Sequence, residues 1–172
     1  MRKVKILRSN LNYLITNCSN NYGPFQDNEK LIPTIIEKLK KNQKIPIYGN
    51  GMQIRDWLYV EDHIDALLLT SNRGKLGERY CIGGNEGISN IELVQIICSI
   101  LDEMNPKNYL HKDLINFVVD RPGHDKKYSV NTAKINLELG WGNKINLKNG
   151  LKKTIEWYFE NQDWLRRKNK IN

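Results

Sequence analysis

The sequence lacks most of the features that mark membrane, secreted and metal-stabilised proteins. Its longest aliphatic run, residues 66–69, is far too short to cross a bilayer. No basic-then-apolar leader opens the chain, so nothing in it predicts export. The three cysteines and three histidines form neither a CxxC nor an HxxxH pair, which argues against a structural zinc site. Because an odd number of widely spaced cysteines is typical of free thiols, we expect a reducing, cytoplasmic compartment.

The net charge of +8 does not by itself predict a nucleic-acid site, because of where the charge lies. Four basic residues fall within positions 1–8 and four within positions 166–170, and neither segment contains an acid. Without these eight, the lysines and arginines equal the 19 acidic residues in number. The excess charge therefore sits at the two ends, and no zinc-finger or RNA-recognition motif accompanies it. A small basic nucleic-acid-binding module is kept as the alternative of a different class.

Apolar spacing predicts one α/β domain in which strands and helices alternate. We expect strands over residues 13–16, 45–48, 54–60, 80–82 and 115–119. We expect helices over residues 31–41, 62–71, 90–105, 131–140 and 147–167, with Asn90 and Asn131 as caps. In the second of these helices, Ile64, Leu67 and Leu68 are expected to face the core.

The chain is organised around residues 44–63, KIPIYGNGMQIRDWLYVEDH. Two strand-like runs flank the turn at residues 49–51, and an Asn-Gly turn between such runs predicts a β-hairpin. Arg55 stands beside Asp56 in the second run. An arginine in so apolar a setting needs an anion, which can be a ligand or a neighbouring carboxylate. Spacing alone leaves both interpretations of Arg55 open.

Two other segments place polar side chains directly after a predicted strand. Residues 17–21, NCSNN, follow the first strand, and α/β folds place ligand groups at such strand ends. Residues 121–125, RPGHD, follow the last strand, and their Pro-Gly turn would present Arg121 and His124. Each segment can equally be an ordinary surface turn.

These segments together would suit a nucleoside diphosphate. Arg55 and Arg121 would take the pyrophosphate, because the guanidinium group matches phosphate oxygens in geometry and charge. Pro46 and Tyr48 would form a flat apolar slot for the base. Spacing predicts nothing more specific than this.

Five segments in a fixed order make the chain resemble a known family. They are TNCSNNYGP (16–24), EKLIP (29–33), IPIYGNGMQIRDWLYVEDH (45–63), GERYCIGG (77–84) and DRPGHDKKYS (120–129). In this combination they resemble the dTDP-glucose 4,6-dehydratases, NAD-dependent lyases of the extended short-chain dehydrogenase/reductase family. The resemblance covers about residues 11–167 and is specific, because QIRDWLYVEDH with RPGHD is typical of dehydratases rather than epimerases.

The resemblance implies a role for each matching residue. The implied substrate-binding residues are Asn20, Lys30, Leu31, Pro46, Tyr48, Arg55, Arg121 and His124. The two arginines would clamp the pyrophosphate, and Pro46 and Tyr48 would flank the thymine. The backbone around Cys18 would face the nicotinamide of NAD. At Cys81 these enzymes usually have asparagine, so one donor to the diphosphate is missing here.

The resemblance also implies what this chain does not carry. The family needs a glycine-rich dinucleotide loop and a Tyr-x-x-x-Lys pair, and the sequence contains neither. We therefore expect the C-terminal substrate-binding lobe of an extended short-chain dehydrogenase fold that lacks most of the Rossmann domain. Residues 1–24 would be a Rossmann remnant, 25–167 the lobe and 168–172 a basic tail.

The expected activity follows from the same resemblance. The intact relatives convert dTDP-glucose to dTDP-4-keto-6-deoxyglucose with NAD, in deoxysugar biosynthesis. This chain is expected to contribute no catalytic residue, to bind the dTDP-sugar and to be inactive alone. Its expected partners are a separate N-terminal half or a second copy in a homodimer.

Overall fold

The computed structural model describes residues 12–120, 122–161 and 164 as an α/β fold, as the sequence predicts. Its strands are β1 (Ile15–Cys18), β2 (Asn20–Tyr22), β3 (Ile45–Tyr48), β4 (Ile54–Tyr59), β5 (Arg79–Ile82), β6 (Gly87–Ser89), β7 (Ile115–Val118) and β8 (Lys127–Tyr128). Its helices are α1 (Leu31–Lys40), α2 (Val60–Arg73), α3 (Asn90–Met104), α4 (Ala133–Leu139) and α5 (Leu147–Glu160), with the 3-10 helix η1 (His111–Leu114). No helix in these ranges has both the length and the apolar character needed to span a membrane.

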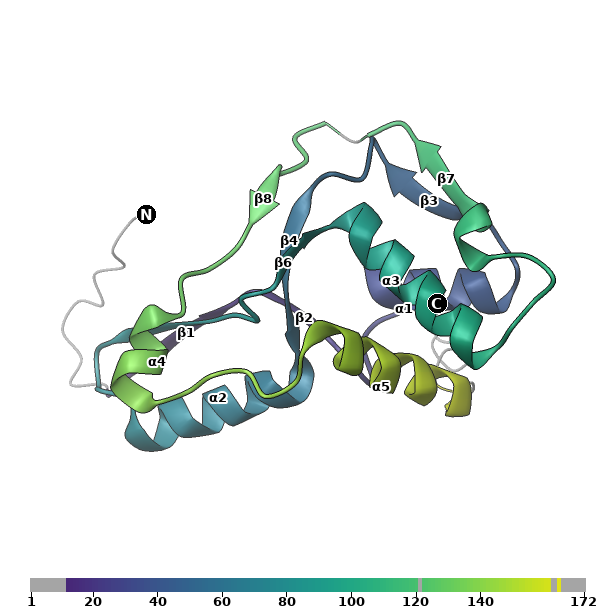
Figure 1. Cartoon of the computed structure of the whole chain (residues 1–172). Helices are drawn as coiled ribbons and strands as arrows, with labels where there is room; N and C mark the ends of the chain where they lie inside the picture. The colour runs from purple at the N-terminus through teal and green to yellow at the C-terminus, as the bar shows by residue number, and fades with distance from the viewer. Residues whose placement is uncertain (1–11, 121, 162–163, 165–172) are drawn as a thin grey trace.

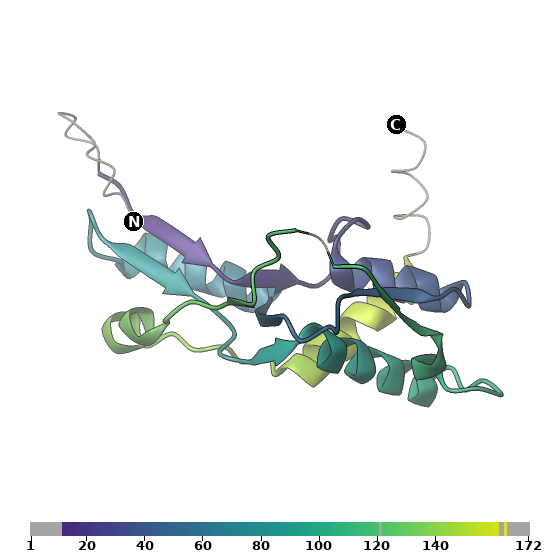
Figure 2. The same ribbon diagram turned by 90° about the horizontal axis from the view of Figure 1, so that it is seen from above.

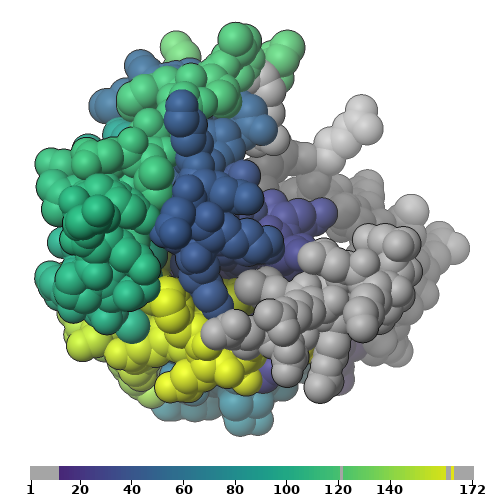
Figure 3. All heavy atoms as spheres, turned by 90° about the vertical axis from the view of Figure 1, so that its right-hand side faces the viewer, coloured from purple at the N-terminus to yellow at the C-terminus, as the bar shows by residue number. Residues whose placement is uncertain are grey.

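The helices and strands pack around two hydrophobic cores that lie side by side (Figure 1). Helices α1, α3 and α5 enclose the larger core together with β3. Figure 3 views this end of the molecule, where atoms of the α1–β3 region (blue), of α3 to β7 (green) and of α5 (yellow) meet in one surface. Strand β5 and helices α2 and α4 enclose the smaller core, with Cys18 of β1 packed against it.

Strand β4 joins the two cores. It pairs in parallel with β2 and β8 and antiparallel with β6. Two separate parallel pairs, β1–β5 and β3–β7, lie toward opposite ends of the molecule (Figure 2). Because strand side chains alternate in direction, Trp57 and Tyr59 of β4 enter the larger core and Leu58 enters the smaller one.

The predicted hairpin over residues 45–60 is wrong. Strand β3 pairs with β7, whereas β4 pairs with β2, β6 and β8. The turn itself is present, with Gly49 at φ 60° and Gly51 at φ 73°. Gly51 donates its N–H to the carbonyl of Tyr48 and packs against Ile47 and Ile91, so the chain turns away toward another sheet. An Asn-Gly pair therefore predicted the bend correctly but not the pairing of its flanks.

The predicted inner face of α2 is also wrong. Ile64, Leu67 and Leu68 are 49%, 37% and 59% exposed, whereas Ala66 and Thr70 are buried. Small side chains on the inner face let the helix lie close to the strands. The apolar outer face therefore has no cover among the residues that the structure describes.

Two predicted caps are displaced by one residue. Ser89, and not Asn90, is the N-cap of α3: its hydroxyl accepts the N–H of Glu92, and the Glu92 carboxylate accepts the N–H of Ser89. This reciprocal pair is a capping box, which satisfies two otherwise free donors. Thr132 is the N-cap position of α4, while Asn131 accepts the N–H of Ala133.

The predictions for the two ends of the chain are only partly covered by the structure. Strand β1 begins two residues later than expected, and β2 lies within the segment expected to be a loop. Helix α5 buries Leu151, Ile155 and Tyr158, as predicted, whereas Phe159 is only partly buried. Most of the predicted continuation to residue 167, and both basic terminal segments, fall outside the described residues.

Candidate functional site

Polar side chains hold together the strand-end loop, by which we mean residues 17–26, from the end of β1 through β2. Asn21 donates from Nδ2 to the carbonyl of Ser19 at 3.1 Å and to Cys18 Sγ at 3.2 Å. Gln26 donates from Nε2 to the carbonyl of Asn21 at 2.7 Å. Asn20 lies in β2, opposite Trp57 of β4. The loop is therefore an ordered part of the sheet and not a loose turn.

An apolar hollow of about 300 Å³ adjoins this loop. It is lined by Asn21, Tyr22, Gly23, Pro24, Phe25, Gln26 and Val60. Phe25 has φ 62° and packs its ring against Trp157, with ring centroids 4.6 Å apart. The polar loop thus has an apolar wall on one side.

Arg55 is half-buried on β4, and it does not pair with Asp56. Its Nη1 donates to the carbonyl of Ile54 at 2.8 Å. Within the described ranges no carboxylate lies at ion-pair distance from it. Asp56 is instead buried, 2% exposed, and accepts the N–H of Glu86 at 3.1 Å. Of the two interpretations of Arg55, internal pairing with a described carboxylate is wrong.

Strand β8 brings the DRPGHDKKYS segment beside Arg55. Tyr128 of β8 is the register partner of Arg55 on β4. Its hydroxyl donates to the carbonyl of Cys18 at 3.2 Å. Three segments that are far apart in sequence therefore meet here: the end of β1, the middle of β4 and β8.

The RPGHD turn is tied to the residue 49–53 turn through Asp120. Asp120 Oδ2 accepts from Gln53 Nε2 at 2.8 Å, and Asp120 Oδ1 lies 2.8 Å from His124 Nδ1. Arg121, between Asp120 and the rest of the turn, lies outside the described residues.

The remaining sequence-predicted residues flank this region. Pro46 is half-buried and Tyr48 is 48% exposed on β3, which is joined to Arg55 by the residue 49–53 turn. Lys30 is the N-cap residue of α1 and binds Glu29 with its ammonium group at 2.9 Å. Leu31 packs partly against the larger core.

Burial and charge fix the protonation of two residues near this region. Burial raises the pKa of the Tyr22 hydroxyl, and the nearby Glu86 adds to this effect. The hydrogen bond to Glu29 raises the pKa of the Lys30 ammonium. Tyr22 therefore stays protonated and Lys30 stays charged near neutral pH.

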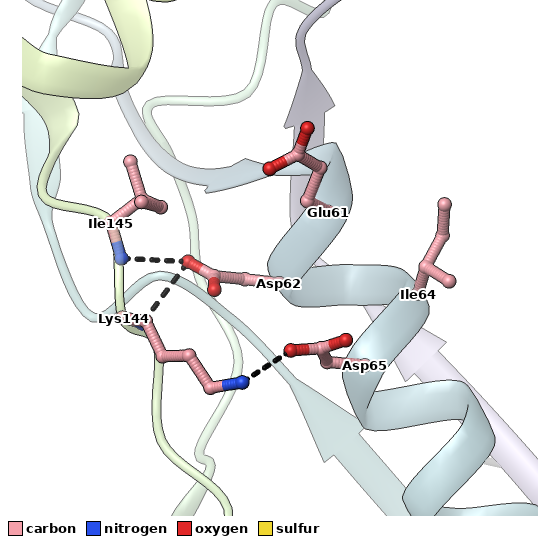
Figure 4. Close-up of a pocket in the computed structure, with 6 residues that line it drawn as sticks. All are labelled: Glu61, Asp62, Ile64, Asp65, Lys144 and Ile145. Atoms are coloured by element: carbon pink, nitrogen blue, oxygen red, sulfur yellow. Dashed lines mark hydrogen bonds and ion pairs between the residues drawn. The ribbon is translucent and has the colours of Figure 1, made fainter.

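A second hollow, of about 360 Å³, lies between α2 and residues 144–145 (Figure 4). Its lining residues are Glu61, Asp62, Ile64, Asp65, Lys144 and Ile145. Asp62 accepts the N–H groups of Lys144 and Ile145, and the Lys144 ammonium lies 2.5 Å from Asp65. Three carboxylates repel a phosphate ligand, so we assign these contacts to holding the loop on α2. The described residues contain no cluster of potential metal ligands.

Gln53, Asp120 and Tyr128 are site residues that the sequence reasoning missed. All three lie inside the quoted segments, but spacing gave no sign that their side chains would join those segments. Cys81, which replaces the usual asparagine, is half-buried on β5 opposite Asn17 of β1.

Comparison with known proteins agrees with this fold. The family model described as GDP-mannose 4,6 dehydratase matches residues 7–154. The dTDP-glucose 4,6-dehydratase of Shigella flexneri is 49% identical over 152 residues, which are 88% of this chain and 42% of that protein. A crystal structure of dTDP-glucose 4,6-dehydratase from Bacillus anthracis in complex with NAD has a TM-score of 0.81 and 39% identity. It is matched over 90% of this chain and 46% of its own.

A second solved structure gives the same result. DesIV, a dTDP-glucose 4,6-dehydratase from Streptomyces venezuelae with NAD bound, has a TM-score of 0.82 and 38% identity over 91% of this chain and 47% of its own. The chain thus spans less than half the length of the relatives it matches. With 148 of its positions inside the family model, the chain belongs to the GDP-mannose 4,6 dehydratase family, and its relatives named here are dTDP-glucose 4,6-dehydratases.

Proposed function

We propose that this chain forms the dTDP-sugar-binding part of a dTDP-glucose 4,6-dehydratase. The observation that supports this most is the half-buried Arg55, which has no described carboxylate partner. It lies beside Tyr128, which reaches the strand end at Cys18. A guanidinium group placed next to a strand-end loop is suited to the pyrophosphate of a nucleotide sugar.

The proposed binding residues surround this arginine. Pro46 and Tyr48 would contact the thymine, and Lys30 and Leu31 the nucleotide. Asn20, Arg55, Arg121 and His124 would contact the phosphates or the sugar, and the backbone at Cys18 would face the nicotinamide. In this division, residues 1–24 complete a Rossmann domain, 25–167 form the substrate lobe and 168–172 form a tail.

NAD would be bound mainly by residues that this chain does not supply. The 172 residues contain no glycine-rich dinucleotide loop and no Tyr-x-x-x-Lys pair, so by themselves they do not fit the cofactor. We propose that an N-terminal half contributes both. Within the described sheet β1 pairs only with β5, which leaves its other edge for another parallel strand. We place the assembly in the cytoplasm, where nucleotide sugars are made.

Complementation tests this function directly. The purified chain with NAD and dTDP-glucose is expected to form no 4-keto-6-deoxy sugar. Adding the part of the Shigella flexneri relative that this chain does not match is expected to restore product formation, detected by the ultraviolet absorbance of the 4-keto sugar in alkali. The two controls are that part alone and that part with an Arg55→Ala chain. Product from the chain alone, or none from the mixture of two folded parts, would contradict the proposal.

A further inference from the structure

Asp120 connects the two segments that carry the proposed pyrophosphate arginines. One carboxylate oxygen accepts a hydrogen bond from Gln53, which precedes Arg55 by two positions. The other oxygen bonds to His124, which follows Arg121 by three positions. A single side chain therefore links both segments.

The surroundings of this carboxylate hold the arrangement in place. Gln53 is 8% exposed, and the side chain of His124 is also 8% exposed. Gly49, at φ 60°, lies so close that a Cβ there would stand 2.9 Å from Asp120 Oδ2. Gly49 therefore has to lack a side chain for the carboxylate to lie here. The Asp120 side chain itself is 36% exposed, but both of its partners are nearly buried. Breaking either hydrogen bond would leave a polar group of a nearly buried side chain unsatisfied.

The contact also determines which atom of His124 can meet a ligand. With Nδ1 donating to Asp120, the neutral ring carries its proton on Nδ1 and leaves Nε2 as the available nitrogen. A carboxylate that bonds to one ring nitrogen of a histidine commonly sets its tautomer and orientation in this way.

We propose that Asp120 is a positioning residue of the nucleotide-sugar site. It fixes the strand that carries Arg55 relative to residues 122–125 and holds His124 in the Nδ1-protonated tautomer. This rests on the proposed function, because it concerns the binding of the same pyrophosphate.

Replacing the Asp120 carboxylate by a neutral amide distinguishes a positioning role from plain charge repulsion, because the two predict opposite changes in dTDP affinity. Removing a carboxylate near a phosphate site should strengthen anion binding, because it removes a repulsion. Asp120→Asn is expected to do the opposite and weaken dTDP binding about tenfold, a loss of the size of one charge-assisted hydrogen bond. Asp125→Asn is the matched control, since it makes the same charge change at an exposed residue of the same turn. It is expected to leave binding unchanged or slightly tighter.

The experiment is calorimetric titration of the 172-residue chain and its variants with dTDP, combined with ¹⁵N NMR of the histidine rings. In the wild type, the His124 resonances are expected to show the Nδ1-protonated tautomer, and in Asp120→Asn a mixture of tautomers. Should Asp120→Asn fail to fold, Gln53→Leu removes one link while keeping the charge, and it is expected to weaken binding in the same direction. Equal behaviour of the Asp120 and Asp125 variants, in affinity and in ring resonances, would overturn the positioning role alone. A folded wild type that does not bind dTDP would overturn the proposed binding function together with it.

Discussion

Arg55 is the residue that most strongly motivates the proposed ligand site. Its guanidinium is partly removed from water yet donates to a neighbouring backbone carbonyl, with no described carboxylate in reach. A desolvated cation of this kind costs free energy unless an anion completes its contacts. The strand fixes the Arg55 backbone on both sides, through Ile88 and Tyr128.

We expect Arg55→Ala to weaken dTDP binding by about 2–4 kcal/mol, the cost of losing a partly buried charged partner. Arg121→Ala is expected to cost less, about 1–2 kcal/mol, toward the lower end of the range for a hydrogen bond to a charged group. Arg73→Ala, an exposed residue at the end of α2, provides the charge-matched control. Calorimetry with dTDP measures all three. A larger loss at Arg121 than at Arg55 would reverse this ranking.

The three cysteines should differ sharply in reactivity. Burial raises the pKa of the Cys98 thiol to about 12, and Asp102 adds to the shift. Cys18 and Cys81 are only half-buried. Because the thiolate is the reactive form, a disulfide reagent at pH 8 is expected to label Cys98 only after unfolding in urea. Equal labelling rates for all three thiols in the folded chain would show this to be wrong.

The raised pKa of Cys98 makes the free energy of unfolding depend on pH. The folded pKa of Cys98 lies above the ordinary thiol value of 9.0, so the folded state holds this proton more tightly than the unfolded state. The contribution to the free energy of unfolding is complete below about pH 9 and is lost as the pH rises toward 12. A Cys98→Ala variant should lack this alkaline loss, as followed by urea unfolding at several pH values.

At the scale of elements, helix α5 is positioned by one glycine. Gly150 faces the hydroxyl of Tyr22, and a Cβ there would overlap that oxygen and crowd the ring of Tyr59. Helix α5 can approach β4 this closely because no side chain intervenes. This position therefore sets the spacing between a helix and the strand that carries Arg55.

We expect Gly150→Ala to destabilise the chain by about 1–3 kcal/mol through overpacking. This is notable because alanine is the better helix former by about 1 kcal/mol at an exposed site. Gly142→Ala, which would meet nothing within 4 Å, is the control and should change stability little. Urea unfolding monitored by circular dichroism measures both. A stabilised Gly150→Ala variant would contradict the packing argument.

Patterns of residues close in sequence predicted most helices and strands, but not which strands pair or which helix face is buried. The strand over Ile45–Tyr48, the helix over Leu31–Lys40 and the stop of α4 at Gly140 follow from residues close in sequence. Pairing of β3 with β7 joins residues about seventy positions apart, and no local pattern encodes it. The inner face of α2 was misread because Ile64, Leu67 and Leu68 are its large apolar residues, yet tertiary packing selected the small ones.

The residues of the candidate site likewise fall into those that the sequence pattern singled out and those that only the structure identified. Arg55 was singled out from its apolar surroundings, although spacing alone left open whether it pairs with Asp56 or meets a ligand. Gln53, Asp120 and Tyr128 could not, because their roles depend on hydrogen bonds across 67 or more positions. Such contacts depend on the long-range pairing of β3 with β7 and of β4 with β8.

For the whole molecule, the outer face of α2 and the edge of β1 that has no partner among the described strands expose surface that favours association. Ile64 and Leu68 are 49% and 59% exposed on α2. Apolar surface together with an unpaired strand edge commonly leads to self-association. We therefore expect the isolated chain to be only marginally stable and to associate as its concentration rises.

Leu68→Glu is expected to shift sedimentation of the chain toward the monomer, because it places a charge on the exposed face without touching either core. Leu137→Glu on α4, where the leucine is 83% exposed, is the control and should have little effect. A wild-type chain that is a monodisperse monomer with a high-temperature, cooperative melt would contradict the expectation.

The alternation along β4 has a consequence for how the family sequence can change. Trp57 and Tyr59 fill one core and Leu58 fills the other, so deleting or inserting a single residue here would exchange the contents of both cores. Substitutions of similar size can accumulate in this segment, whereas changes in length cannot. We therefore expect the packing of the two cores to constrain the number of residues between Arg55 and α2, whatever Arg55 itself contacts.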